Sequence, residues 1–320
     1  MAIDLTNQSH KKFTFEIIYE DSHGDPKTAV TALQKLLSET SLPAIIGENI
    51  SSSTLAMIPL IDKAQKVLIS PSASSPKLSG SSQYFFRVFP SDVEEGFFMT
   101  GIISKAIPGA KVCILFMNND FGVGLKEVFE KNAESKGLQV LETFGYDKSI
   151  NDFRTVLTRV KQLKPDAIYL AGYYQDGGAI LRQAKQLGIN STFWGSTTHE
   201  DPQLLTIAGD AAEGFRYPVS TGFDPNSPDS VIQKFVEDFR TKYKKEPGLV
   251  SALGYDCAKL ITDAIVTTGG AVPDQIRSFL ANTKDYRGAT GRMTFDNRGD
   301  VHKTIVLKTV QNQEFIFARQ

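Results

Sequence analysis

Short apolar runs alternate along the chain with longer segments in which apolar residues recur at helical spacing. Runs of roughly four to eight residues between turn formers predict buried strands, and apolar positions three or four residues apart predict helices. The predicted strands are 13–19, 44–47, 67–70, 85–89, 111–117, 138–144, 167–172, 192–195, 304–310 and 314–318. The predicted helices are 25–38, 52–66, 92–105, 124–136, 149–163, 177–187, 229–243 and 249–268. This alternation indicates an α/β fold built from βαβ units with largely parallel sheets.

The length of 320 residues is too great for one ordinary core and favours two domains of roughly 100–200 residues each. The segment 218–228 (PVSTGFDPNSP) is rich in turn formers and is predicted to be a linker.

Composition and charge exclude several classes of partner. Lys plus Arg number 35 and Asp plus Glu 36, and no run of five like charges occurs, which argues against a nucleic-acid surface or a polybasic membrane patch. No segment approaches the roughly 18 consecutive apolar residues of a membrane-spanning helix. Asp4 comes too early for the apolar core of a secretory signal. We therefore expect a soluble chain with no stable membrane insertion.

Cys113 and Cys257 lie far apart in apolar surroundings, and both are predicted to be small buried hydrophobic residues. No cysteine spacing is typical of a metal site, and we expect neither a metal nor a cofactor.

Polar loops follow three of the predicted strands. Residues 51–54 are four consecutive hydroxyl residues at a helix start, where unpaired N–H groups and the helix dipole favour an anion. Residues 70–76 (SPSASSP) follow the next strand, and 171–176 (AGYYQD) follow a strand of the second half. Ligands of open α/β sheets bind beyond the carboxyl ends of strands, so these loops are candidate ligand contacts.

Eight motifs in a fixed order carry a family resemblance. They are YEDSHGDPKTAV (19–30), IGENISSST (46–54), ISPSASSP (69–76), FRVFPSD (86–92), NNDFGVG (118–124), PDAIYLAGYY (165–174), LRQAKQLG (181–188) and GDAAEG (209–214). In this order and spacing the chain resembles the periplasmic solute-binding proteins of the leucine/isoleucine/valine-binding family, the type I group that supplies ABC transporters. The resemblance covers nearly all of the chain.

The resemblance implies two doubly wound Rossmann-like lobes joined by three crossovers, with a ligand held between them by hinge closure. Residues 1–118 plus 221–303 would form the N-terminal lobe, and 119–220 plus 304–320 the C-terminal lobe. It further implies a non-catalytic protein of the periplasm or another extracytoplasmic space. This protein would deliver an amino acid or related small carboxylate to a transporter permease.

The resemblance also implies site residues in the first lobe. Ser51 and the amides of Ser52 and Ser74 would hold the carboxylate of the ligand, helped by the Ser74 hydroxyl. The carbonyl of Ser72 would receive an ammonium group, and Ala73 would lie alongside.

In the second lobe, the resemblance implies that Phe121 and Tyr173 close over the ligand. Amino-acid-binding relatives also place an acid in the loop after the strand 192–195, and that position falls on Thr197 here. A buried ammonium without a carboxylate is costly. Either a nearby acid such as Glu200 or Asp201 substitutes, or the ligand is an aromatic or other organic acid that lacks an ammonium.

The start of the chain departs from the resemblance as well. Relatives begin with a strand and a long helix, and residues 2–7 resemble only the tail of that helix. The first lobe is therefore expected to lack its N-terminal strand, and to be unstable or completed by another chain.

Two enzyme classes fit the sequence less well. The GxG of residues 122–124 has Glu127 where a dinucleotide-binding fingerprint needs a third glycine. No hydrolase motif is present, and His199-Glu200-Asp201 is predicted to be a surface loop. One non-enzymatic alternative stays open, because the same fold serves as the ligand-sensing domain of receptors and of a cytoplasmic amide sensor.

Overall fold

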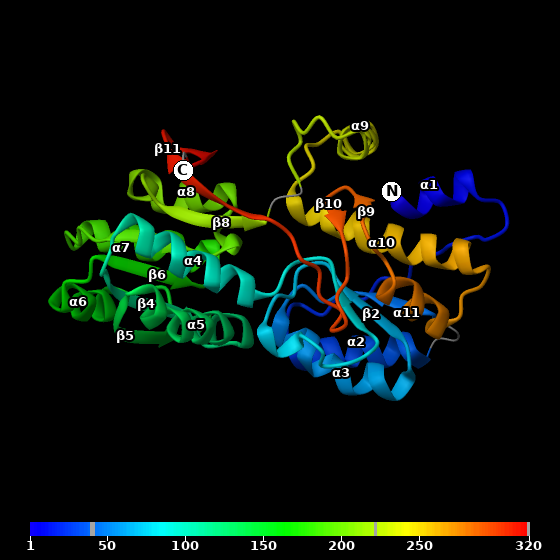
Figure 1. Cartoon of the computed structure of the whole chain (residues 1–320), viewed down its shortest axis with the longest axis horizontal. Helices are drawn as coiled ribbons and strands as arrows, with labels where there is room; N and C mark the ends of the chain where they lie inside the picture. The colour runs from blue at the N-terminus through cyan, green and yellow to red at the C-terminus, as the bar shows by residue number, and fades with distance from the viewer. Residues whose placement is uncertain (39–41, 221–222, 319–320) are drawn as a thin grey trace. The chain divides into compact units, whose positions relative to one another are not determined.

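The computed structural model describes residues 1–38, 42–220 and 223–318, which form two compact units (Figure 1). The first unit comprises Met1–Ser91 and Thr221–Thr304, and the second comprises Asp92–Ser220 and Ile305–Gln320. The chain therefore passes between the units three times. Both units are mixed α/β structures, as the alternating pattern predicted.

The first crossing lies earlier than predicted. Residues 92–118 were expected in the first lobe, but they group with the second unit. The physical reason is their packing: α4 (Asp92–Ala106) packs on α5 (Asp120–Ala133), and β4 (Lys111–Met117) is paired on both edges by strands of the second unit.

The second unit contains a seven-stranded sheet of order β12-β11-β8-β7-β6-β4-β5. The strands from β4 to β8 are parallel, whereas β11 runs antiparallel to its two neighbours. The remaining strands are β5 (Gln139–Tyr146), β6 (Ala167–Ala171), β7 (Thr192–Gly195), β8 (Arg216–Ser220), β11 (Ile305–Gln311) and β12 (Glu314–Phe317). The other helical segments are η2 (Glu134–Lys136), α6 (Arg154–Leu163), α7 (Tyr174–Gln186), η3 (Thr197–His199), α8 (Pro202–Ala208) and η4 (Gly209–Ala212).

The first unit contains a parallel sheet of order β1-β2-β3 and a separate antiparallel pair, β9 and β10. Its strands are β1 (Ala44–Ile46), β2 (Val67–Ser70), β3 (Phe85–Arg87), β9 (Tyr286–Gly288) and β10 (Gly291–Met293). Its helical segments are α1 (Ala2–Ser9), α2 (Pro26–Ser38), α3 (Ser51–Ala64), η1 (Pro76–Leu78), α9 (Ser230–Tyr243), α10 (Leu249–Thr268) and α11 (Pro273–Ala281).

The parallel sheet of the first unit is buried on both faces because its side chains alternate. Val67 and Ile69 of β2 pack with the apolar residues of α10 and α11, whereas Leu68 packs with those of α2 and α3. A continuous apolar run is what a strand covered on both faces requires. The predicted burial of both cysteines is confirmed, since Cys113 and Cys257 are free and fully buried.

The prediction of a strand at residues 13–19 is wrong. The structure has no strand there. The Asn7 side chain instead accepts the Phe15 N–H and donates to the Phe15 carbonyl, each at 2.9 Å. Phe13 and Phe15 pack on the core, while Ile17, Ile18 and Tyr19 are 44%, 49% and 82% exposed. A β-prone sequence forms a strand only where a ladder partner is available, and none pairs with it among the described residues. The expected instability of this lobe, or its completion by another chain, stays a prediction.

Other differences are smaller. The predicted linker at 218–228 begins too early, because β8 extends to Ser220; residues 221–222 lie outside the described structure. The pattern did not predict α8, α11, β9 or β10, which are short elements of seven, nine, three and three residues. Among the described helices, none combines the length and apolar character that crossing a bilayer requires.

Candidate functional site

Two loops of the first unit meet at the carboxyl end of its parallel sheet. The first leaves β1 at Gly47, whose φ of +143° favours glycine, and leads to α3. The helix begins at Ser51, and its N-cap residue Ile50 provides no side-chain cap. Its first N–H groups therefore lack the side-chain acceptor that a Ser, Thr, Asp or Asn at the N-cap would supply.

The second loop follows β2 and is tied to the first through serine side chains. The Ser51 hydroxyl accepts the N–H groups of Ser74 and Ser75 at 3.2 and 3.1 Å. The Ser72 hydroxyl donates to Asn49 Oδ1 at 2.9 Å. The structure thus brings the predicted residues Ser51, Ser72 and Ser74 together, but the Ser74 N–H points to Ser51.

The remaining predicted residues of this unit lie in the same place. Ser52 is half-buried in the first turn of α3, and Ala73 is fully buried between Ser72 and Ser74. The Ala73 N–H donates to the Ser70 hydroxyl at 2.9 Å, and that hydroxyl donates to the Glu48 carbonyl at 2.6 Å. These bonds fix both loops within one hydrogen-bonded layer.

Arg87 supports the second loop from inside the unit. Its guanidinium Nη1 donates to the carbonyls of Ala73 and Ser75 at 3.3 and 3.0 Å, and Nη2 donates to the Ser79 hydroxyl at 2.7 Å. Nε donates to Asp300 Oδ1 at 2.7 Å, and both side chains are almost fully buried. The sequence reasoning did not single out this residue, although an arginine in the apolar run 85–89 is the signal that could have found it.

In the second unit, an aromatic pair lies beyond the ends of β4 and β6. Phe121, in the first turn of α5, and Tyr173, just before α7, have ring centroids 5.3 Å apart at an interplanar angle of 34°. The Tyr173 N–H donates to the Asp176 carboxylate at 3.0 Å, which fixes the start of α7. Burial raises the pKa of Tyr173 to about 12, so its hydroxyl is protonated at neutral pH. The structure brings these two predicted residues together.

Thr197 contacts an acid that the sequence reasoning missed. Its hydroxyl donates to Glu95 Oε2 at 2.6 Å, and its N–H lies 3.3 Å from Glu95 Oε1. Glu95 belongs to α4 and is only 5% exposed. The signal was present in the sequence, because Glu95 lies four residues before Met99 and eight before Ile103, on the apolar face of its helix.

The acids that were expected near Thr197 have partners elsewhere. Glu200 hydrogen-bonds to Lys308, and Asp201 caps α8 by accepting the Gln203 N–H at 2.8 Å. The carboxylate that hydrogen-bonds to the Thr197 side chain is that of Glu95.

The prediction of a surface loop at His199 is wrong, because its ring is fully buried and packs on Phe215 with centroids 5.3 Å apart. Cβ atoms at Gly177 or Gly195 would clash with this ring, so the two glycines make room for it. Burial lowers the pKa of His199 to about 4, which keeps the imidazole neutral at physiological pH.

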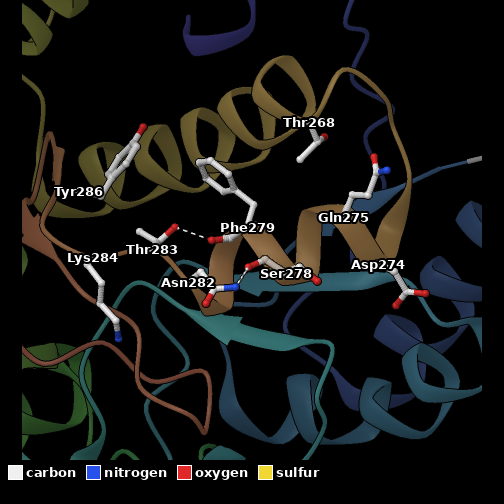
Figure 2. A pocket seen from close by; sticks show the side chains of 9 residues that line it. All are labelled: Thr268, Asp274, Gln275, Ser278, Phe279, Asn282, Thr283, Lys284 and Tyr286. Carbon is white, nitrogen blue, oxygen red and sulfur yellow. Dashed lines mark hydrogen bonds between the residues drawn. The ribbon is translucent and has the colours of Figure 1, made fainter.

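A separate open hollow of about 740 Å³ lies on the first unit at the end of α11 (Figure 2). It is lined by Thr268, Asp274, Gln275, Ser278, Phe279, Asn282, Thr283, Lys284 and Tyr286. Thr283 and Asn282 donate to the carbonyls of Phe279 and Ser278, so these side chains complete the last turn of the helix (Figure 2). The hollow contains none of the predicted site residues.

Comparisons with known proteins agree on one family. A family model described as periplasmic binding protein matches residues 1–313. A leucine-, isoleucine-, valine-, threonine- and alanine-binding protein of Pseudomonas aeruginosa is 26% identical over 287 residues, which cover 89% of this chain and 75% of that protein.

Two solved structures are similar over almost the whole chain. A leucine-binding protein of Thermotoga maritima has a TM-score of 0.90 at 29% identity and covers 99% of this chain and 91% of its own. A branched-chain amino acid transporter substrate-binding protein of Streptococcus pneumoniae, in complex with isoleucine, has a TM-score of 0.86 at 26% identity. It covers 98% of this chain and 90% of its own.

Proposed function

The chain belongs to the periplasmic binding protein family, and we propose that it is the solute-binding component of an ABC importer whose ligand is an amino acid or a related small carboxylate. The similar proteins of P. aeruginosa, T. maritima and S. pneumoniae are named as amino-acid-binding proteins, not enzymes. In this proposal the chain has no catalytic role, works in the periplasm or another extracytoplasmic space, and delivers its ligand to a membrane permease.

The hydrogen bonding of Ser51 carries the proposal. A serine oxygen has two acceptor positions and one hydrogen to donate. The N–H groups of Ser74 and Ser75 occupy both acceptor positions. The only capacity left to the hydroxyl is its own hydrogen, which suits an anion. The start of α3, with no side-chain cap, adds N–H donors and the positive end of the helix dipole.

The other predicted residues take roles consistent with this anion site. We assign the Ser52 amide and the Ser74 hydroxyl to the ligand carboxylate, the Ser72 carbonyl to an ammonium group, and Ala73 to a neighbouring apolar contact. Phe121, Tyr173 and Thr197 of the second unit are proposed to contact the same ligand. The flat faces of the aromatic pair suit the apolar part of an amino acid.

The test is ligand binding by a Ser51→Ala/Ser74→Ala double variant. Hydrogen bonds to a charged group are worth about 1.5–3 kcal/mol each, so we expect affinity to fall by at least about 10-fold for each group lost. Isothermal titration calorimetry with L-leucine, L-isoleucine and L-phenylalanine measures this directly, after a thermal-shift screen identifies which of them binds.

Ser53→Ala is the matched control for this experiment. Ser53 lies on the same helix and is fully buried, and its hydroxyl has no hydrogen-bond partner among the described residues. Its loss should leave affinity unchanged. Removal of the Ser51 oxygen also leaves two amides without an acceptor, so the unfolding transition of each variant has to be measured alongside. A double variant that is folded and binds as tightly as the wild type would refute the site.

A further inference from the structure

A buried carboxylate in the second unit faces the predicted ligand residue Thr197. Glu95 accepts the Thr197 hydroxyl at 2.6 Å and lies 3.3 Å from its N–H, although the two residues are 102 positions apart in sequence. The two residues belong to different elements, because Glu95 lies in the first turn of α4 and Thr197 begins the short helix η3 after β7. The contact is therefore a product of the fold.

The Glu95 carboxylate has no cationic partner within the described parts of the chain. Among the described residues, the groups that act on Glu95 are Asp92 and Thr197, and none is a Lys, Arg or His side chain. Asp92 adds a second carboxylate from the same helical turn. An ionised carboxylate that is removed from water without a cationic partner is costly.

A second buried polar group on which Glu95 acts is the hydroxyl of Tyr169. Tyr169 is fully buried, and its hydroxyl has no hydrogen-bond partner among the described residues. Burial, and then the charges of Glu95 and Asp92, raise the pKa of Tyr169. Buried polar groups normally find partners, and one without a partner calls for an explanation such as a ligand.

Thr197, the partner of Glu95, lies at the carboxyl edge of the parallel strands of the second unit. Thr197 follows β7, Tyr173 follows β6, and Phe121 lies in the helix after β4, so all three stand beyond the carboxyl ends of parallel strands. Asp92 is among the groups that act on Tyr173. In open α/β sheets this edge is where ligands bind.

We propose that Glu95 binds the ammonium group of the ligand, so that the ligand is an amino acid rather than an organic or aromatic acid without an amine. The inference rests on the proposed function and narrows its ligand class. An ammonium group supplies the missing cation and donates up to three hydrogen bonds, which the Glu95 carboxylate and the Tyr169 oxygen can accept.

Binding of the amine should also release a proton. Burial, then the charge of Asp92, raises the pKa of Glu95 to about 8, so the empty protein holds it protonated at pH 7. Tyr169 and Tyr173 of this region stay protonated at that pH. His199, in the same turn as Thr197, stays neutral because burial lowers its pKa to about 4, and burial raises the pKa of Asp176, which lies beside Tyr173. A bound ammonium favours the ionised carboxylate, and up to about one proton per ligand should leave.

The test compares ligands that differ only in the amine. L-leucine is paired with 4-methylpentanoate, and L-phenylalanine with 3-phenylpropanoate, by calorimetry on the wild-type chain and on Glu95→Gln. The wild type should prefer the amine of a pair by at least about 100-fold. Glu95→Gln should reduce that preference by at least about 30-fold, because the loss of one partner of a buried charge pair weakens binding strongly. Titrations in two buffers of different ionisation enthalpy should show proton release for the wild type only.

Two further variants separate a ligand contact from a structural role. Glu94→Gln makes the same chemical change one residue away, on a different face of α4, and should keep the wild-type preference. Glu95→Gln/Thr197→Glu moves the acid to the other side of the hydrogen bond and should restore preference for the amine. The unfolding transition of Trp194, which lies in this unit, shows whether each variant is folded.

The outcomes are distinct. If the wild type binds an acid without an amine as tightly as its amino acid, the inference is overturned while carboxylate binding stands. If Glu95→Gln keeps the amine preference, or the wild type releases no proton, Glu95 is not the ammonium contact. If no member of either pair binds, the proposed function fails, and the inference fails with it.

Discussion

Replacing Arg87 with methionine should lower the free energy of unfolding of the first unit by about 3–5 kcal/mol, because it removes the buried partner that lies 2.7 Å from the Asp300 carboxylate and leaves only the exposed Arg298, 3.9 Å from Oδ2. The guanidinium also donates to the carbonyls of Ala73 and Ser75 and to the Ser79 hydroxyl, and methionine can replace none of these bonds. Both partners of the ion pair are essentially inaccessible to solvent, so water cannot take over. The variant should also weaken ligand binding, since the freed carbonyls belong to the loop of Ser72 and Ser74.

The position of the single tryptophan allows this effect to be localised. Trp194 is buried in the second unit, so its fluorescence follows unfolding of that unit, whereas far-UV circular dichroism follows both. In urea, Arg87→Met should shift the dichroism transition to lower denaturant and leave the Trp194 transition nearly unchanged. If both transitions shift together, the two units unfold as one, and the loss of stability is then read from the common midpoint.

Two control variants define what the ion pair contributes. Arg298→Gln removes an arginine that is 55% exposed, pairs with Asp296 at 3.4 Å and lies 3.9 Å from Asp300 Oδ2. Because this pair is solvent-exposed and long, its loss should cost no more than about 1 kcal/mol. Arg87→Met/Asp300→Leu removes both charges and should recover part of the loss, because apolar replacement of a buried pair avoids a lone charge. A loss below about 1 kcal/mol in Arg87→Met would show that the pair does not hold the loop.

Most of the fold could be predicted from the sequence because strands that are buried on both faces leave long apolar runs. The run from 111 to 117 and the run from 167 to 171 are central strands in the structure, at the places where the pattern put them. The segment 13–19 has an equally strong β pattern but no ladder partner in the part of the chain that the structure describes, and a pattern of residues cannot show whether a partner is present.

The proximity of the candidate residues was predictable where they lie in neighbouring polar loops, and unpredictable where the fold brings distant residues together. Ser51 and Ser74 stand in conspicuous polar loops, and their contact is a direct hydrogen bond across the two loops. Glu95 and Arg87 lie in segments that resemble ordinary core, and their partners are 102 and 213 residues away. The burial of His199 was not predicted, because Gly177 and Gly195 leave the space for its ring. A pattern of residues does not show that these glycines lie beside the ring.

Glu95→Gln should stabilise the second unit of the ligand-free protein at neutral and higher pH. The pKa of Glu95 is about 8 in the folded chain and 4.5 as its ordinary value, chiefly because burial disfavours the charged form. Between these values the folded state holds a proton that the unfolded state has lost, so wild-type stability falls as pH rises from 4.5 to 8. Glutamine keeps a similar shape and does not ionise in either state. The gain should therefore grow with pH and reach about 3 kcal/mol near pH 7.

The measurement is best made between pH 6.5 and 8. His199 has the opposite dependence, since its lowered pKa of about 4 makes the second unit gain stability as pH rises from 4 to 6.5. Above 6.5 the His199 contribution is nearly constant, so the difference in pH dependence between the wild type and Glu95→Gln reports the Glu95 carboxyl. Over this window, urea unfolding followed by Trp194 fluorescence should show the wild type losing about 2 kcal/mol, while Glu95→Gln loses little.

Glu94→Gln is the control, and its pH dependence should follow the wild type. If the free energy of unfolding depends on pH equally in the wild type and in Glu95→Gln, Glu95 ionises freely in the folded protein. It would then not be a buried carboxyl group that needs a cation to ionise. If the unfolding free energy of Glu95→Gln does not change with pH and this variant binds the amine more weakly, the Glu95 side chain lowers the stability of the ligand-free protein and stabilises the complex with the ligand. Such a trade between stability and function is common where a charged group is buried for the sake of a ligand. A bound ammonium ion would remove the penalty, so the amino acid should stabilise the wild type more than the variant.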